Sequence, residues 1–147
     1  MTAKPVLVFV YGTLRRGGSR AIPDRFPAAK FIAKARVTGH LYDLQVSGDH
    51  YPGLKLNQDG TAVVGEIYEV DENTLRRLDA IEGDSGNASS SLFVRTATAA
   101  VTIDARQRLD CYVYEFNEER HPRQTLIRGG DWIKYLAERG NSKYRAG

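Results

Sequence analysis

The order of extended and helical segments is the feature that most restricts the fold of this chain of 147 residues. Runs rich in strand-forming residues come first, then a helical pattern, then more extended runs and a second helical pattern. The extended runs lie at residues 6–11, 31–44, 61–70, 91–103 and 109–116. Because strands and helices do not alternate regularly, a doubly wound parallel sheet is disfavoured. We expect an α+β protein built on a small, mostly antiparallel β-barrel, with residues 1–147 forming one domain.

The clearest helical pattern is the stretch ENTLRRLDAI. Asp71 precedes it and is a favoured N-cap residue, while Leu75, Leu78 and Ile81 recur on one face. Gly83 then ends the pattern. The stretch GGDWIKYLAERG near the C-terminus predicts a second helix.

Turn-forming residues mark the connections between these elements. Residues 48–54 (GDHYPGL) read as turn throughout, and the Asp-Gly pair at 59–60 suits a hairpin with the extended run that follows it. Gly39, inside an extended run, predicts a bulge or a close approach of another chain segment. Residues 83–91 (GDSGNASSS) are small and polar, so we expect a flexible surface loop there.

The single cysteine and the scattered histidines limit disulfide and metal chemistry. Cys111 lies in the alternating apolar run LDCYVYEF, which predicts a buried core thiol. The histidines His40, His50 and His121 lack ligand spacing, so we expect no metal and no cofactor. One cysteine suits a reducing compartment, and we expect a cytoplasmic protein. No apolar run approaches the roughly 20 residues that cross a bilayer, so no membrane partner is expected.

The formal charge of +3 comes largely from basic residues in the first quarter of the chain. They include Arg15, Arg16, Arg20, Arg25, Lys30, Lys34 and Arg36, against Asp24 alone. Two interpretations stay open: a solvated basic face, or an electric field that attracts small anionic substrates. No recognised nucleic-acid motif accompanies the charges, so we expect no nucleic-acid partner.

The stretch VLVFVYGTLRRGG is a buried strand that leads into a glycine-rich loop. A Walker phosphate loop is excluded, because TLRRGGS follows Gly12 without the required lysine. The dinucleotide fingerprint G-x-G-x-x-G is absent as well. The backbone N–H groups of this loop could form an anion-binding nest, or the loop could simply join two elements.

Two glutamates are candidates for acid–base chemistry. Glu82 ends the first helical stretch, where the helix dipole disfavours a negative charge, and this placement suits a proton shuttle. The alternative is an exposed glutamate on a frayed turn. Glu66 alternates with Val64, Tyr68 and Val70, which favours a structural pair, with an arginine as one candidate partner. No Ser-His-Asp or Cys-His pattern stands out, so nucleophilic catalysis is not indicated.

Several motifs together resemble the γ-glutamylcyclotransferase-like family, which includes the γ-glutamylamine cyclotransferases. In order along the chain they are VYGTLRRGG, GHLYDL, YPGL, VVGEIYEV, LRRLDAIEG, FVR, CYVYEF and IRGGDW. The resemblance spans roughly residues 6–135. It implies a small mixed β-barrel flanked by a few helices. It also implies release of an amine or amino acid from a small γ-glutamyl compound, with formation of 5-oxoproline.

The resemblance also assigns site residues. It makes Glu82 the single general base and then acid. It gives the backbone of the YGTL element the task of holding the glutamyl α-carboxylate and orienting the γ-carbonyl, and it places a tyrosine in the pocket wall. The substrate-binding residues so implied are Tyr11, Gly12, Thr13, Leu14 and Tyr114.

Two features depart from the family pattern. Phe93 stands where many relatives have a tyrosine, two residues before the position of Arg95, and the stretch between Glu82 and Phe93 is longer than usual. A non-catalytic member of the same fold that binds a small molecule is therefore the alternative. The resemblance gives no role to Arg15 and Arg16, and we expect them at the rim of the pocket, guiding anions.

Overall fold

The computed structural model describes residues 5–12, 22–84, 86 and 91–139. The predicted extended runs and both predicted helices are present. The elements are β1 (Val6–Val10), α1 (Ile22–Arg25), β2 (Lys30–Val46), β3 (Asp49–Leu56), β4 (Thr61–Val70), α2 (Glu72–Glu82), β5 (Phe93–Thr102), β6 (Arg108–Phe116), η1 (Glu118–Arg120), β7 (Gln124–Ile127) and α3 (Trp132–Arg139).

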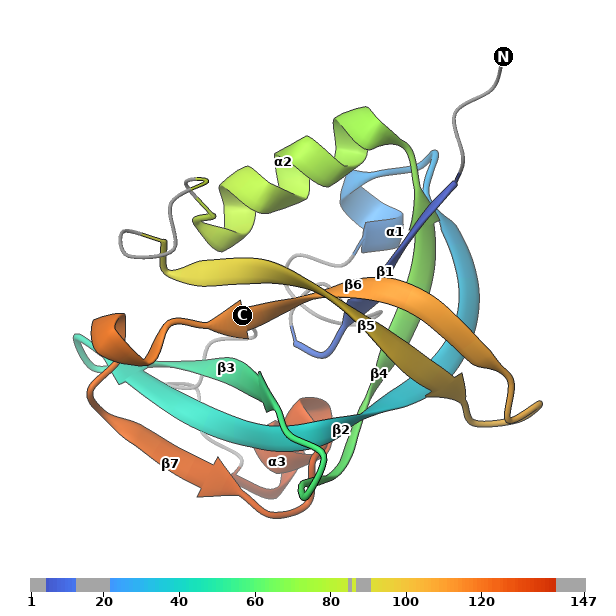
Figure 1. Ribbon diagram of the computed structural model, residues 1–147. Coiled ribbons are helices and arrows are strands. Elements are labelled where there is room, and N and C mark those ends of the chain that lie inside the picture. The colour runs from blue at the N-terminus through green and yellow to red at the C-terminus, as the bar shows by residue number, and fades with distance from the viewer. Residues whose placement is uncertain (1–4, 13–21, 85, 87–90, 140–147) are drawn as a thin grey trace.

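Five strands close into a barrel (Figure 1). Around the ring, β1 pairs with β4, β4 with β2, β2 with β5, and β5 with β6, all antiparallel. The parallel pair of β1 with β6, at Val8 and Tyr112, closes the ring. The predicted α+β fold, a mixed and mostly antiparallel barrel with flanking helices, is confirmed.

The long strand β2 pairs with different strands along its two halves, and the turn between β3 and β4 crosses it at Gly39. Its first half pairs with β4 and β5, and its second half pairs with β3 and β7. A Cβ atom on Gly60 would lie 2.4 Å from the carbonyl oxygen of Gly39, which confirms the predicted close approach. The hairpin predicted at residues 59–60 is wrong. Here β3 and β4 pair with opposite sides of β2, so the turn carries the chain over β2.

The turn predicted over residues 48–54 is also wrong, because most of this stretch belongs to β3. The turn is confined to Ser47 and Gly48, whose φ angles are 51° and 85°. Pairing with β2 overrides the local turn propensity. Gly53 serves packing instead, since a Cβ atom there would lie 2.6 Å from Cδ1 of Leu44 and 2.8 Å from Cδ1 of Phe116.

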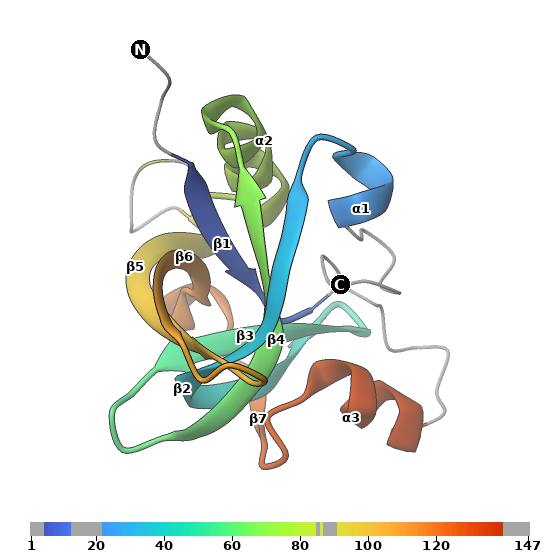
Figure 2. The ribbon, with the colours of Figure 1, turned by 90° about the vertical axis from the view of Figure 1, so that its right-hand side faces the viewer.

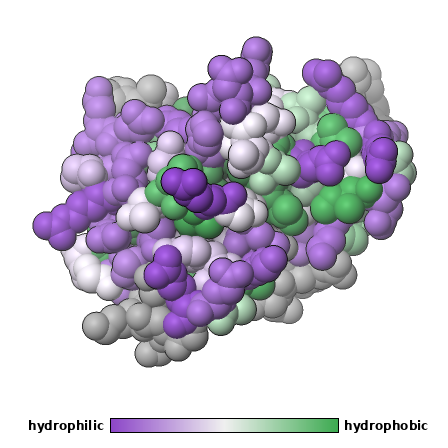
Figure 3. All heavy atoms as spheres, turned by 90° about the horizontal axis from the view of Figure 1, so that it is seen from below, coloured by the Kyte–Doolittle hydropathy of each residue, from purple (hydrophilic) through white to green (hydrophobic). Residues whose placement is uncertain are grey.

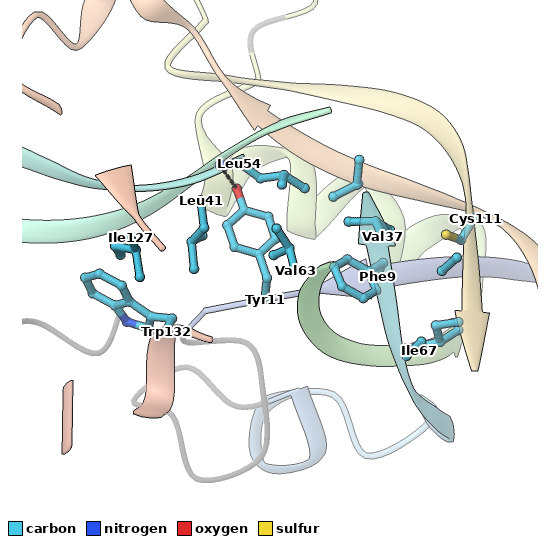
Figure 4. Packing of buried hydrophobic residues seen from close by; sticks show 13 residues of the cluster. Phe9, Tyr11, Val37, Leu41, Leu54, Val63, Ile67, Cys111, Ile127 and Trp132 are labelled. Atoms are coloured by element: carbon cyan, nitrogen blue, oxygen red, sulfur yellow. Dashed lines mark hydrogen bonds between the residues drawn. The ribbon is translucent and has the colours of Figure 1, made fainter. Parts of the chain in front are cut away.

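The barrel interior holds the main hydrophobic core (Figure 4). Side chains alternate along β1, so Phe9 and Tyr11 point into this core. Cys111 is buried as predicted, and burial raises the pKa of its thiol to about 11. The helix α3 follows β7 near the lower edge of the molecule in the view of Figure 2. Its first residue, Trp132, is fully buried and belongs to this core.

A second core lies between the barrel and α2, on the opposite side of β1. Leu75 and Leu78 of α2 pack there, with Ile81 partly buried beside them. The predicted helix ends are confirmed: the Asp71 carboxylate accepts a hydrogen bond from the Thr74 N–H at 2.7 Å, and Gly83 ends the helix in a left-handed conformation with φ 74°. The C-terminal end of α2 is thereby fixed against the barrel.

The face opposite α2 is largely hydrophilic, with hydrophobic areas exposed between the hydrophilic side chains (Figure 3). Each helix within the described residues is too short or too polar to span a lipid bilayer. The loop predicted over residues 83–91 falls mostly outside the described residues.

Candidate functional site

A cavity of about 290 Å³ opens where the end of β1 meets the end of α2. Tyr11 and Gly12 line it from β1, Ile81 and Glu82 from α2, and Tyr114 from β6. The volume lies near the lower end of ligand-binding cavities, so it suits a small molecule. The described part of the chain thus brings together four of the predicted site residues, Tyr11, Gly12, Glu82 and Tyr114. The remaining two, Thr13 and Leu14, lie outside the described residues.

Gly12 permits a close approach between the end of β1 and β3. A Cβ atom at this position would lie 2.5 Å from Cγ of Pro52, well inside van der Waals contact. Pro52 also lines the cavity. Any larger residue at position 12 would push the two walls of the cavity apart.

The side chain of Tyr11 connects the strands that form the cavity wall. Its hydroxyl donates to the carbonyl oxygen of Tyr114 at 2.5 Å and accepts from the Leu54 N–H at 3.3 Å (Figure 4). Burial, and after it the negative charge of Glu82, raise the pKa of the Tyr11 phenol well above its ordinary value. The phenol therefore stays neutral and braces β1 against β3 and β6.

Tyr114 belongs to a network that reaches from β6 to α2 and β5. Its hydroxyl donates to Oδ1 of Asp79 at 2.7 Å, and Nε of Arg95 lies 3.2 Å from the same oxygen. The Arg95 guanidinium lies 4.7 Å from the ring centre of Tyr112. Burial raises the pKa of Tyr114, and the bond to Asp79 and the charges of Asp79 and Glu82 add to this shift. The phenol keeps its proton, directed at Asp79, so its oxygen can act towards a ligand only as an acceptor.

Sequence reasoning missed Asp79 and Arg95 as parts of the site. Asp79 stands three residues before Glu82, a spacing that places two side chains on one helix face. That spacing could have identified Asp79. Arg95 could not have been placed, because its partner comes from another element.

Glu82 is the only carboxylate among the described residues that line the cavity. Its charge acts on the phenols of both Tyr11 and Tyr114, which places it within electrostatic reach of both walls. The rival candidate Glu66 is not among those lining residues. It is buried and accepts a hydrogen bond from the Tyr68 hydroxyl at 2.8 Å, which fits a structural role.

Four further lining residues form what we call the outer part of the cavity: Leu92, Phe93, Arg120 and His121. Leu92 and Phe93 lie at the start of β5, and Arg120 and His121 lie at the end of η1. Arg120 is the only arginine or lysine among the described lining residues. The rings of Phe93 and His121 lie 5.6 Å apart, so the residue that departs from the family pattern faces the cavity beside an imidazole.

The described residues contain no group of three or more side chains that could hold a metal ion. His50 instead contacts the buried carboxylate of Asp43 through Nδ1 at 2.8 Å. Tyr135 donates to the same carboxylate at 2.7 Å, which links α3 to β2.

The fold and the cavity define a small mixed β-barrel protein with a cavity of small-molecule size at the end of β1. The model of the family "Gamma-glutamyl cyclotransferase, AIG2-like" matches residues 8–134. The chain belongs to this family, as the motifs indicated.

Similar proteins carry the names of enzymes. The chain is 41% identical over 128 residues to gamma-L-glutamyl-butirosin B gamma-glutamyl cyclotransferase of Niallia circulans, covering 87% of this chain and 76% of that one. It is 36% identical over 123 residues to the gamma-glutamylaminecyclotransferase of Homo sapiens, covering 74% and 76%. A crystal structure of an AIG2-like protein from Mus musculus is similar, with a TM-score of 0.65, 29% identity, and coverage of 77% and 78%.

Proposed function

We propose that this protein is a cyclotransferase that acts on a small γ-glutamyl compound, releasing an amine or amino acid and forming 5-oxoproline. Membership of the family and the enzyme names of the relatives support the reaction class. The observation that supports the assignment most directly is the position of Glu82. It is the single carboxylate among the described cavity-lining residues, at the helix end that faces the end of β1.

In the proposed reaction the substrate's own α-amine attacks its γ-carbonyl carbon. A carbon–nitrogen bond forms to close the ring, and the original amide bond breaks. Over the whole reaction the α-ammonium nitrogen gives up two protons, and the leaving nitrogen gains two as it departs as an ammonium. Because the attack is intramolecular, holding the folded conformer supplies much of the rate.

Glu82 is the proposed proton carrier. As general base it takes a proton from the α-nitrogen, and as general acid it gives that proton to the leaving nitrogen. Two such transfers, one for each proton, return Glu82 to its ionised form. The Tyr114 oxygen is proposed to accept a hydrogen bond from the α-ammonium, which the direction of its own proton towards Asp79 supports. Backbone N–H groups of the YGTL element are proposed to hold the α-carboxylate and to stabilise the developing oxyanion.

The test is the Glu82→Gln substitution, assayed by 5-oxoproline release over γ-glutamyl amines, γ-glutamyl amino acids and glutathione. We expect loss of release with an unchanged thermal unfolding curve. Glu72→Gln is the matched control, because Glu72 lies on the same helix, 70% exposed, at the other end. Full activity in the Glu82→Gln variant would show that this carboxylate is not the proton carrier.

A non-catalytic binding protein is the second candidate, and Phe93 is the observation that favours it. The wall of the cavity has a phenyl ring where many relatives have a phenol. Calorimetry with a γ-glutamyl amine, followed by analysis for 5-oxoproline, separates the two. Binding of the intact compound with no product would support the binding protein.

A further inference from the structure

The charges around the cavity are unevenly distributed. Among the described lining residues, Glu82 is the only anion and Arg120 the only arginine or lysine. Arg120 is exposed and lines the same cavity as the apolar side chains of Leu92 and Phe93. The cavity lining therefore combines a carboxylate, apolar side chains and a guanidinium group.

Acidic residues close in sequence to the outer part are engaged elsewhere or are absent from the cavity lining. Asp84 accepts backbone hydrogen bonds from Arg95 at 3.0 Å and from Gly86 at 2.9 Å. Glu118 and Glu119 are exposed on η1 and are not among the lining residues. By sequence, the stretches 13–21 and 85–90 contain no Asp or Glu. A leaving group that ends in a cation would thus find no carboxylate counter-ion among the described lining residues of the outer part.

The backbone that carries Arg120 is held firmly against the cavity wall. Asn117 donates through its backbone N–H to the Leu92 carbonyl and through its side-chain amide to the Ser91 carbonyl, both at 3.0 Å. Nδ1 of His121 donates to the Asn117 carbonyl at 2.9 Å. These bonds fix η1 to the segment that enters β5, so the backbone of Arg120 is held next to the cavity lining.

His121, the next residue after Arg120, adds its ring to the cavity wall that Leu92 and Phe93 form. The side chain is 5% exposed, and its ring lies 5.6 Å from the ring of Phe93 and 5.9 Å from that of Phe116. A branched or aromatic side chain of a leaving group could pack on these rings while a carboxylate reached Arg120. Planar guanidinium groups suit carboxylates because they can donate two parallel hydrogen bonds.

We infer that the leaving group is an apolar amino acid whose α-carboxylate is bound by Arg120. The substrate class is then γ-glutamyl dipeptides of apolar amino acids rather than γ-glutamyl amines. This inference rests on the proposed function and names its specificity-determining residue.

The experiment compares γ-glutamyl-leucine with γ-glutamyl-3-methylbutylamine, which differ only by the α-carboxylate of the leaving group. We expect the wild-type kcat/KM for 5-oxoproline release to be about tenfold higher for the leucine compound, the size of one charged hydrogen bond. In the Arg120→Gln variant the ratio of the two kcat/KM values should fall towards one. Arg123→Gln is the matched control, since Arg123 is exposed nearby and is not among the lining residues.

The possible results distinguish a wrong role for Arg120 from a wrong proposed function. Equal turnover of both compounds by the wild type, or an unchanged preference in Arg120→Gln, overturns the inference while the proposed function stands. Absence of 5-oxoproline from both compounds overturns the proposed function, and the inference that rests on it falls with it.

Discussion

The contact between Gly12 and Pro52 allows a quantitative test of how the site is held together. In Gly12→Ala the new Cβ atom would lie 2.5 Å from Cγ of Pro52, so β1 or β3 has to move. Overpacking of this kind costs about 1–3 kcal/mol in the free energy of unfolding. Because a displacement of about 1 Å in a substrate-positioning element can cost roughly 100-fold in rate, 5-oxoproline release should fall more than stability does.

Removing the opposing ring should rescue the variant. Pro52→Ala deletes Cγ and Cδ and leaves Cβ, which lies 3.6 Å from the place that the new methyl group would take, an ordinary contact. We expect Gly12→Ala/Pro52→Ala to be at least about 1 kcal/mol more stable than the sum of the single substitutions predicts. Urea unfolding measures the four free energies. Gly129→Ala is the control, because a Cβ atom there would have no neighbour within 4 Å.

Additive free energies in this cycle would refute the reasoning. They would mean that the ring of Pro52 moves aside at little cost and that Gly12 is not needed for the close approach. An unchanged rate of 5-oxoproline release in Gly12→Ala would likewise show that the end of β1 does not position the substrate.

Three further predictions concern the elements behind the site. Leu78→Ala should lower the free energy of unfolding by about 2–5 kcal/mol in urea, because the side chain is fully buried under α2; a loss below about 1 kcal/mol would contradict this packing role. Tyr114→Phe removes the hydrogen bond to Asp79 and should cost about 1–2 kcal/mol and reduce 5-oxoproline release, and a variant with wild-type stability and rate would exclude that role. Partial burial opposes ionisation of Asp84, but hydrogen bonds from two backbone N–H groups and a serine hydroxyl outweigh it and lower its pKa. The ionised Asp84 therefore stabilises the fold above about pH 5, and this contribution is lost as the pH falls towards about 2. In Asp84→Asn the free energy of unfolding should decline less steeply over that range. Parallel curves of unfolding free energy against pH for the variant and the wild type would refute this.

Sequence patterns predicted the elements that are held together by residues close to one another in the chain. The helix α2 was recognisable because its cap at Asp71, its apolar face and its end at Gly83 all lie within one segment. The extended runs of β5 and β6 were recognisable because they are rich in strand-forming residues, and the two strands pair with each other over nine positions.

The stretch 48–60 shows what local reasoning could not supply. Its glycines and Pro52 resemble turn residues, but β3 forms because β2 is long enough to pair with it beyond the barrel. The crossing at Gly39 and Gly60 depends on two segments whose glycines meet only in the fold. Propensity is a weak guide wherever a distant strand decides the pairing.

The site shows the same division between local and distant signals. The motifs identified Glu82 and the end of β1, because each is a short recognisable segment. Arg120 was not predicted, since nothing near it in sequence indicates that η1 returns to the cavity. Its position depends on the hydrogen bonds between Asn117 and the segment before β5.

The network around Asp79 explains why the proposed reaction can use one carboxylate although α2 presents two on neighbouring turns. Oδ1 of Asp79 already accepts from the Tyr114 hydroxyl and pairs with Arg95, so this carboxylate is engaged within the protein. Glu82, one turn later, lines the cavity instead. Tyr114 connects the two, because directing its proton to Asp79 leaves an oxygen that can only accept on the side of the ligand. A substrate ammonium would then meet two acceptors, Tyr114 and Glu82, of which only the carboxylate can carry a proton to the leaving nitrogen.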